Sequence, residues 1–135
     1  MTVVDASVAL KWFVEEDGAD AAAGLIGQQL AAPALIFGEI TNTLWKKVRQ
    51  GAVTAPQAQE SLAALPQFFA EIVPLDVLAA HALRLATELN HPAYDCCYLA
   101  LAEMRDEVLI TADLRFVQAC GNTAHAGRLR LLGPA

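Results

Sequence analysis

Short apolar runs alternate with longer helix-type stretches along this chain of 135 residues. The clearest run is Val-Leu-Ile-Thr at residues 108–111, which lies between two helix-type segments. A short, continuous apolar run of this kind is typical of a strand that is buried on both faces of a sheet. Because strands that alternate with helices usually form a parallel sheet, the pattern predicts an α/β fold.

Start and stop signals divide the chain into expected strands and helices. We expect the strands at residues 2–5, 31–32, 72–75, 108–111 and 129–132. We expect a short helix around residues 12–13 and longer helices at residues 17–30, 33–50, 54–66, 76–89, 92–104 and 113–120. Pro33 and Pro92 suit the first helical position, and Thr54 and Asp76 suit the N-cap. No repeat or linker interrupts the pattern, so the length predicts a single domain over residues 1–135.

The composition excludes several classes of protein. Hydrophobic residues make up 56% of the chain and charged residues 18%, whereas disordered chains are poor in apolar residues and rich in charge. No run of about 18 apolar residues occurs, and the N-terminus lacks the pattern of a signal peptide, so we expect a cytoplasmic protein.

The adjacent Cys96 and Cys97 show no disulfide spacing, and we expect them in the core. The apolar excess predicts that a partner covers part of the surface.

Two acids follow expected strands. Asp5 ends the first strand, and Asp113 comes just after the strand at residues 108–111. In an open parallel sheet, ligands bind outside the carboxyl ends of the strands. The sequence therefore leaves two interpretations open for each acid, which are a helix N-cap and part of a binding site.

Two further acids stand in helical segments that are largely apolar. Glu39 shares a helix face with Asn42 and Lys46, at offsets of three and seven residues. Asp95 lies in the first turn of a helix that is almost wholly apolar after that turn. An acid among apolar residues needs a partner or a metal, because a buried charge is otherwise costly. A solvated helix face for Glu39 and a helix-dipole role for Asp95 are the alternative interpretations.

The charge balance limits how the chain binds other molecules. Nine Lys and Arg stand against 15 Asp and Glu, which argues against a generic polyanion binder. The candidate metal ligands are carboxylates, without His or Cys at metal-binding spacing, which favours Mg²⁺ over Zn²⁺. A bound metal would let such an acidic protein approach a phosphodiester. Lys11, Lys46 and Arg115 are candidates for phosphate contacts, with surface solubility as the alternative.

The ordered set of motifs resembles the PIN-domain ribonucleases, and in particular the VapC-type toxins of toxin–antitoxin pairs. The matching segments are Val-Asp-Ala-Ser-Val at residues 4–8, Lys-Trp-Phe at 11–13, Glu-Ile-Thr-Asn at 39–42, Tyr-Asp-Cys-Cys-Tyr-Leu-Ala-Leu-Ala at 94–102 and Leu-Ile-Thr-Ala-Asp-Leu-Arg-Phe at 109–116. By motif match, the resemblance implies a catalytic and metal-binding quartet of Asp5, Glu39, Asp95 and Asp113. It gives supporting roles to Ser7, Asn42 and Thr111.

The resemblance also implies a PIN-like three-layer α/β/α sandwich with a short, mainly parallel sheet. It implies a Mg²⁺- or Mn²⁺-dependent endoribonuclease toxin, in which a metal-activated water attacks an RNA phosphodiester. The implied partners are the RNA substrate, a second copy of the chain and a cognate antitoxin that neutralises the enzyme. No further acid occurs in the four residues after Asp113, so the sequence leaves one or two metals open.

Three rival functions fit the sequence less well. A phosphatase with an Asp nucleophile would have Asp-x-Asp at the end of the first strand, whereas here Ser7 takes the second position. A receiver-like phosphoacceptor domain would have an acid pair before the phosphorylated Asp and a Lys after a late strand, and neither feature fits. A catalytically weak PIN-fold protein that binds RNA or protein is the third alternative, against which the complete set of four acids argues.

Overall fold

The apolar runs form one five-stranded sheet in the computed structural model, which describes residues 1–133. The strands are β1 (Thr2–Val4), β2 (Leu30–Pro33), β3 (Glu71–Val73), β4 (Leu109–Thr111) and β5 (Leu129–Leu131). Their order is β3-β2-β1-β4-β5, and every neighbouring pair is parallel. The chain builds the sheet outward from β1 first on one side and then on the other. This change of direction creates a switch point between β1 and β4.

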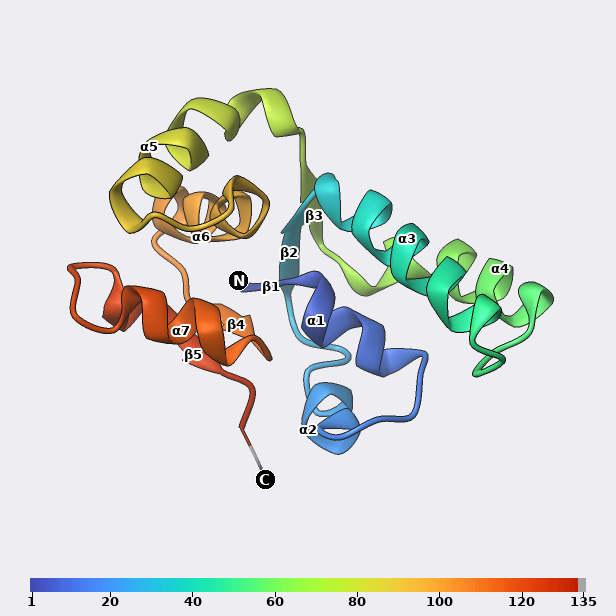
Figure 1. Cartoon of the computed structure of the whole chain (residues 1–135). Coiled ribbons are helices and arrows are strands. Elements are labelled where there is room, and N and C mark those ends of the chain that lie inside the picture. The colour runs from blue at the N-terminus through green and yellow to red at the C-terminus, as the bar shows by residue number, and fades with distance from the viewer. Residues whose placement is uncertain (134–135) are drawn as a thin grey trace.

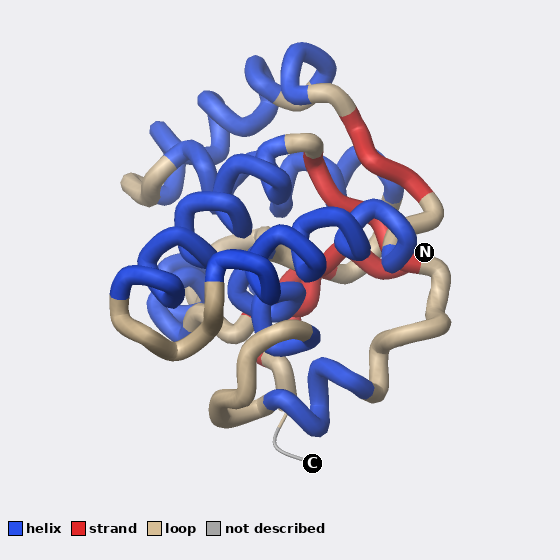
Figure 2. Tube along the Cα trace, turned by 90° about the vertical axis from the view of Figure 1, so that its right-hand side faces the viewer, coloured by secondary structure: helices blue, strands red, loops and turns tan. Residues whose placement is uncertain are grey.

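Helices account for most of the molecule around this short sheet (Figure 2). They are α1 (Ala6–Ala9), α2 (Ala19–Ala23), α3 (Leu35–Arg49), α4 (Ala55–Ala64), α5 (Ala79–Leu89), α6 (Ala93–Arg105) and α7 (Leu114–Cys120). Short 3₁₀ turns lie at Leu10–Trp12, Leu65–Phe68, Leu75–Val77 and Ala126–Arg128. Figure 1 shows α5 packed on α6 at one side of the molecule and α3 beside α4 at the other.

The central strand β1 divides the apolar core between two faces of the sheet. Val3 belongs to a large core that includes residues of α3, α5, α6 and α7. Val4 belongs to a smaller cluster with Val8 of α1 and Ala22 of α2. Successive side chains of a strand point to opposite faces, so helices cover the sheet on both sides. The expected three-layer α/β/α arrangement is confirmed.

Helix α6 is the buried centre of the larger core. All seven residues at positions 96–102 are buried, including both adjacent cysteines. Burial raises the pKa of the Cys96 thiol to about 12, so this thiol stays protonated and unreactive. The expected core position of Cys96 and Cys97 is confirmed. Within the described part of the chain, no helix combines the length and apolar character needed to cross a membrane.

Two expected boundaries around β2 are wrong. Helix α2 ends at Ala23 rather than near Leu30. In the turn that follows, Gly27 takes a left-handed backbone (φ 92°), which the helix expected to reach Leu30 could not contain. Pro33 does not start a helix but is the last residue of β2, opposite Val73. Proline cannot donate to a sheet ladder, and the next residue, Ala34, donates its N–H to Val73 O at 2.8 Å instead.

The expected cap of α5 is also wrong, whereas that of α4 is confirmed. Asp76 lies in the 3₁₀ turn Leu75–Val77, and α5 begins after Leu78 without a side-chain cap. Leu78 is fully buried, so core packing rather than capping fixes this helix start. Thr54 caps α4 in a capping box with Gln57.

Candidate active site

The switch point of the sheet brings the two strand-end acids to neighbouring positions. Asp5 follows β1, Asp113 follows β4 by two residues, and these strands pair directly. Each carboxylate caps the next helix: Asp5 Oδ1 accepts the Val8 N–H at 3.3 Å, and Asp113 Oδ1 accepts the Arg115 N–H at 3.0 Å. The two interpretations left open by the sequence are therefore compatible, because one oxygen of a carboxylate is enough for a cap.

A pocket of about 220 Å³ lies at this edge of the sheet. Its lining contains all four acids of the expected quartet, namely Asp5, Glu39, Asp95 and Asp113. They come from four separate places in the fold: the ends of β1 and β4, the first half of α3 and the first turn of α6. The other lining residues are Ala6, Ser7, Leu10, Thr43 and Tyr98.

Asp5 is the most buried of the four acids, with 6% of its surface exposed. Burial raises the pKa of Asp5 to about 6, and repulsion by Asp95 adds to the rise. Hydrogen bonds from Ser7 and Thr111 oppose it, because they stabilise the charged form. Ser7 Oγ donates to Asp5 Oδ1 at 2.5 Å. A buried carboxylate that faces a second acid favours a cation beside it.

Ser7 and Thr111 join the loops that follow β1 and β4. Ser7 Oγ accepts the N–H of Ala112 at 2.9 Å and lies 3.5 Å from Thr111 Oγ1. Thr111 is fully buried, and its hydroxyl accepts the N–H of Asp113 at 3.0 Å. The structure thus places both of these expected supporting residues between the two strand-end acids, where they fix one loop to the other.

Glu39 enters the pocket from α3 and contacts a tyrosine that the sequence pattern did not single out for the site. The hydroxyl of Tyr98, a residue only 1% exposed, donates to Glu39 Oε1 at 2.5 Å. Burial raises the pKa of Glu39, the Tyr98 hydrogen bond opposes the rise, and the charge of Asp95 adds to it. The available signal was spacing, since Tyr98 follows Asp95 by three residues and shares its face of α6.

Asp95 also has a partner that the sequence pattern gave no role. Nε2 of His91 lies 2.7 Å from Asp95 Oδ2. The imidazole stacks on the ring of Phe116, with ring centroids 4.6 Å apart and planes 10° from parallel. The four-residue spacing between His91 and Asp95 was the signal in the sequence.

Comparison with known proteins places this geometry in a family. The sequence model of the PIN domain matches residues 2–122, a span that contains all four pocket acids. The chain belongs to the PIN-domain family. It is 30% identical over 120 residues to Ribonuclease VapC3 from Pyrobaculum aerophilum, which covers 86% of this PIN domain's chain and 92% of the relative. The recognition made from the sequence motifs is confirmed.

Solved structures show the same fold at lower identity. A toxin–antitoxin complex from Klebsiella pneumoniae has a chain that is 18% identical, with a TM-score of 0.73 and coverage of 100% of both chains. A chain in the structure of VapBC2 from Rickettsia felis, which is bound to a DNA fragment from the VapBC2 promoter, is 14% identical to this chain, with a TM-score of 0.69. The match covers 96% of this chain and 97% of that chain. At these identities the likeness establishes the PIN fold.

Two residues expected near Glu39 do not line the pocket of this PIN domain. Asn42 and Lys46 are both exposed on α3. Thr43 lines the pocket instead, and its hydroxyl donates to Glu39 O at 3.0 Å. On a helix, the residues three and four positions after Glu39 point to opposite sides of the Glu39 side chain. The pocket lies on the side of the fourth position, which is Thr43.

The basic residues proposed for phosphate contacts differ in their surroundings. Lys11 Nζ lies 3.1 Å from Glu16 Oε1 and 2.6 Å from Asp17 O, so it is tied to the loop after the first 3₁₀ turn. Arg115 is exposed in the first turn of α7, two residues after Asp113. Arg115 is therefore better placed than Lys11 to reach a ligand at the pocket.

The donor set of the pocket fits a hard divalent cation. Among residues 1–133, no three His, Cys, Asp or Glu side chains converge closely enough to enclose an ion. Mg²⁺ does not require such a cage, because it commonly binds through one or two carboxylates and keeps several waters. The pocket acids supply only oxygen donors. Burial, with a smaller contribution from repulsion by Asp95, raises the pKa values of Asp5 and Glu39, and a cation would stabilise their charged forms.

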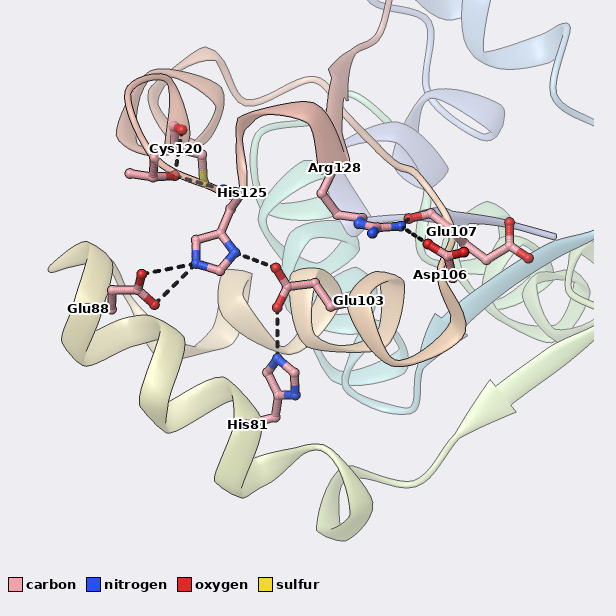
Figure 3. Close-up of polar contacts among 9 residues, drawn as sticks. His81, Glu88, Glu103, Asp106, Glu107, Cys120, His125 and Arg128 are labelled. Atoms are coloured by element: carbon pink, nitrogen blue, oxygen red, sulfur yellow. Dashed lines mark hydrogen bonds and ion pairs between the residues drawn. The ribbon is translucent and has the colours of Figure 1, made fainter.

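A second cluster of titratable side chains lies outside the acidic pocket (Figure 3). The carboxylate of Glu103 on α6 bridges His81 on α5, at 2.8 Å, and His125 in the loop after α7. The other ring nitrogen of His125 lies 3.1 Å from Glu88 Oε2 on α5. Both nitrogens of His125 thus face carboxylates, which favours the imidazolium form because only this form donates from both.

Proposed function

We propose that this PIN domain is the toxin of a toxin–antitoxin pair and that it cleaves RNA as a Mg²⁺- or Mn²⁺-dependent endoribonuclease. The observation that carries the proposal is the convergence of Asp5, Glu39, Asp95 and Asp113 from four elements on one pocket. The curated relative that is 30% identical is named a ribonuclease, which supports this class of reaction.

The chemistry follows from the charge of the pocket. A bound divalent cation would supply positive charge to the phosphodiester and promote ionisation of an attacking water. One or two of the four carboxylates, together with waters, would hold this cation. Ser7 orients Asp5 and Tyr98 orients Glu39 by hydrogen bonds. The same carboxylates alone would repel an RNA phosphate, so cleavage should depend strictly on the metal.

We further propose a cognate antitoxin and a second copy of the chain as partners. Both solved structures described above contain toxin–antitoxin assemblies, which supports the first of these. Large apolar side chains at the surface, such as Trp45 at 53% and Leu83 at 64% exposed, provide area for a partner to cover.

Cleavage by the purified protein tests the reaction. RNA should be cut in Mg²⁺ or Mn²⁺ and stay intact in EDTA. We expect Asp5→Asn, Asp95→Asn and Asp113→Asn each to abolish cleavage while circular dichroism stays that of the parent. Asp76→Asn is the matched control, because Asp76 is an exposed acid outside the pocket. A folded variant of a pocket acid that cuts at the parental rate would remove that residue from the site.

A further inference from the structure

We propose that His91 is a positioning residue, which holds the carboxylates of Asp95 and Asp113 in register for the divalent cation. This inference rests on the function proposed above. His91 does not line the pocket itself, so it would act through its neighbours rather than on the RNA.

The first contact of His91 fixes Asp95. Nε2 of the imidazole lies 2.7 Å from Oδ2, a hydrogen bond that restricts rotation of the carboxylate. One oxygen of Asp95 is occupied in this way, which leaves the other to a cation. Outer hydrogen-bond partners of metal ligands commonly act by such orientation.

The second contact reaches the helix that follows Asp113. The imidazole stacks on Phe116, which is fully buried in the first turn of α7. The N–H of Phe116 lies 3.4 Å from Asp113 Oδ1, which caps this helix. A single ring therefore lies between the start of α6, which carries Asp95, and the start of α7, which Asp113 caps.

The backbone around His91 is itself well fixed. Asn90 ends α5 in a left-handed conformation (φ 50°), and the His91 N–H donates to Ala86 O at 3.2 Å. Pro92, which has a restricted φ, leads directly into α6. The imidazole is thus held between α5 and α6 on one side and α7 on the other, as a positioning group must be.

Calorimetric titration of the metal-free protein with Mn²⁺ measures the binding affinity and tests the proposal without relying on cleavage. His91→Phe keeps an aromatic ring on Phe116 and removes the hydrogen bond to Asp95. We expect it to bind Mn²⁺ about 10–100-fold more weakly than the parent, at a similar melting temperature in EDTA. His91→Gln restores a side-chain N–H and should recover most of the lost affinity.

His81→Phe is the matched control for this series. His81 is likewise an imidazole hydrogen-bonded to a helix carboxylate, Glu103 at 2.8 Å, but this pair lies outside the pocket. The control should bind Mn²⁺ with parental affinity. In cleavage assays at saturating Mn²⁺, His91→Phe should keep the parental KM for RNA, whereas an RNA contact by His91 would raise it.

Three other outcomes would overturn the proposal. Parental or tighter Mn²⁺ binding by His91→Phe would show that His91 does not position the ligands, while the proposed ribonuclease function would stand. Equal loss of affinity in His91→Gln and His91→Phe would show that the hydrogen bond to Asp95 does not account for the loss. A parent protein that binds no Mn²⁺ would contradict both this inference and the metal-dependent function.

Discussion

The carboxyl group of Asp5 is held in surroundings that disfavour its charged form. It is nearly excluded from water, it faces Asp95, and its hydrogen bonds from Ser7 and Thr111 only partly compensate. A residue that served only as a helix cap would gain nothing from such burial. These surroundings are understandable if Asp5 works with a bound cation, because the cation would stabilise the charged form.

We expect the free energy of unfolding of the metal-free protein to fall as the pH rises from about 4 to about 6. The folded carboxyl of Asp5 has a pKa of about 6 against a reference value of 3.8, so the folded state binds more protons in this range. Above both values the loss is at most roughly 3 kcal/mol. Urea unfolding in EDTA measures it. Asp5→Asn keeps the hydrogen-bond acceptor without the charge and should show a smaller decrease, to which Glu39, whose pKa is also raised, still contributes. An identical decrease in parent and variant would assign the whole effect to groups other than Asp5.

On helix α3, the neighbouring polar residues Asn42 and Thr43 point in different directions. Thr43 lines the pocket beside Glu39, whereas Asn42 is exposed. We therefore expect Thr43→Val, which removes a hydroxyl from the pocket lining, to lower the cleavage rate by less than about 10-fold, because this hydroxyl donates to the backbone carbonyl of Glu39 rather than to its carboxylate. Asn42→Ala, one position away on the same helix, should cleave like the parent. The opposite order of rates would place the pocket on the other side of α3.

The loop between α7 and β5 should be held more weakly at high pH. Burial alone would lower the pKa of His125, but hydrogen bonds and charge from Glu103 and Glu88 raise it above its ordinary value. Stabilisation by the imidazolium is therefore complete below the unfolded value of about 6.5 and is lost as the pH rises through the folded value. Proteolysis of the loop, compared between pH 6 and pH 8.5, should accelerate in the parent. In His125→Gln the loop should be cut rapidly at both values; a parent loop that is equally resistant at both would contradict this.

The elements also show which parts of the fold were predictable from the sequence. The starts of α4 and α7 follow from local chemistry, since Thr54 and Asp113 each cap the helix that comes next. Asp76 has the same chemistry but does not cap α5, because the burial of Leu78 decides where that helix begins. Pro33 suited a helix start equally well, yet pairing with β3 placed it in a strand.

The distinction between local chemistry and tertiary packing applies to the pocket as well. The four acids could be found from their motifs and from their positions after strands or in apolar helices. Tyr98 and His91 could not be assigned in this way, because a buried hydroxyl and an imidazole acquire a role only from the residues that tertiary packing places beside them. Spacing along α6 puts Tyr98 on the same face as Asp95, whereas His91 lies before this helix, and in neither case does spacing identify the partner.

For the molecule as a whole, we expect the complex with the antitoxin to be inactive as a ribonuclease. A basic side chain of the antitoxin, such as arginine, would pair with the pocket carboxylates in place of the cation. RNA cleavage by the co-purified complex should be far below that of the free protein in the same Mn²⁺ concentration, and should appear when the antitoxin is removed by proteolysis. Equal cleavage by the complex and the free protein would contradict this blocking role.

The order of the strands has a consequence for synthesis of the protein on the ribosome. Asp5 is made early and Asp113 late, and they come together only when β4 pairs with β1 at the centre of the sheet. A growing chain that has not yet released β4 from the exit tunnel holds no complete set of carboxylates. Under the proposed function, the ribosome and the messenger being translated would therefore be spared until β4 has emerged, and a product that is truncated before β4 should not cleave RNA.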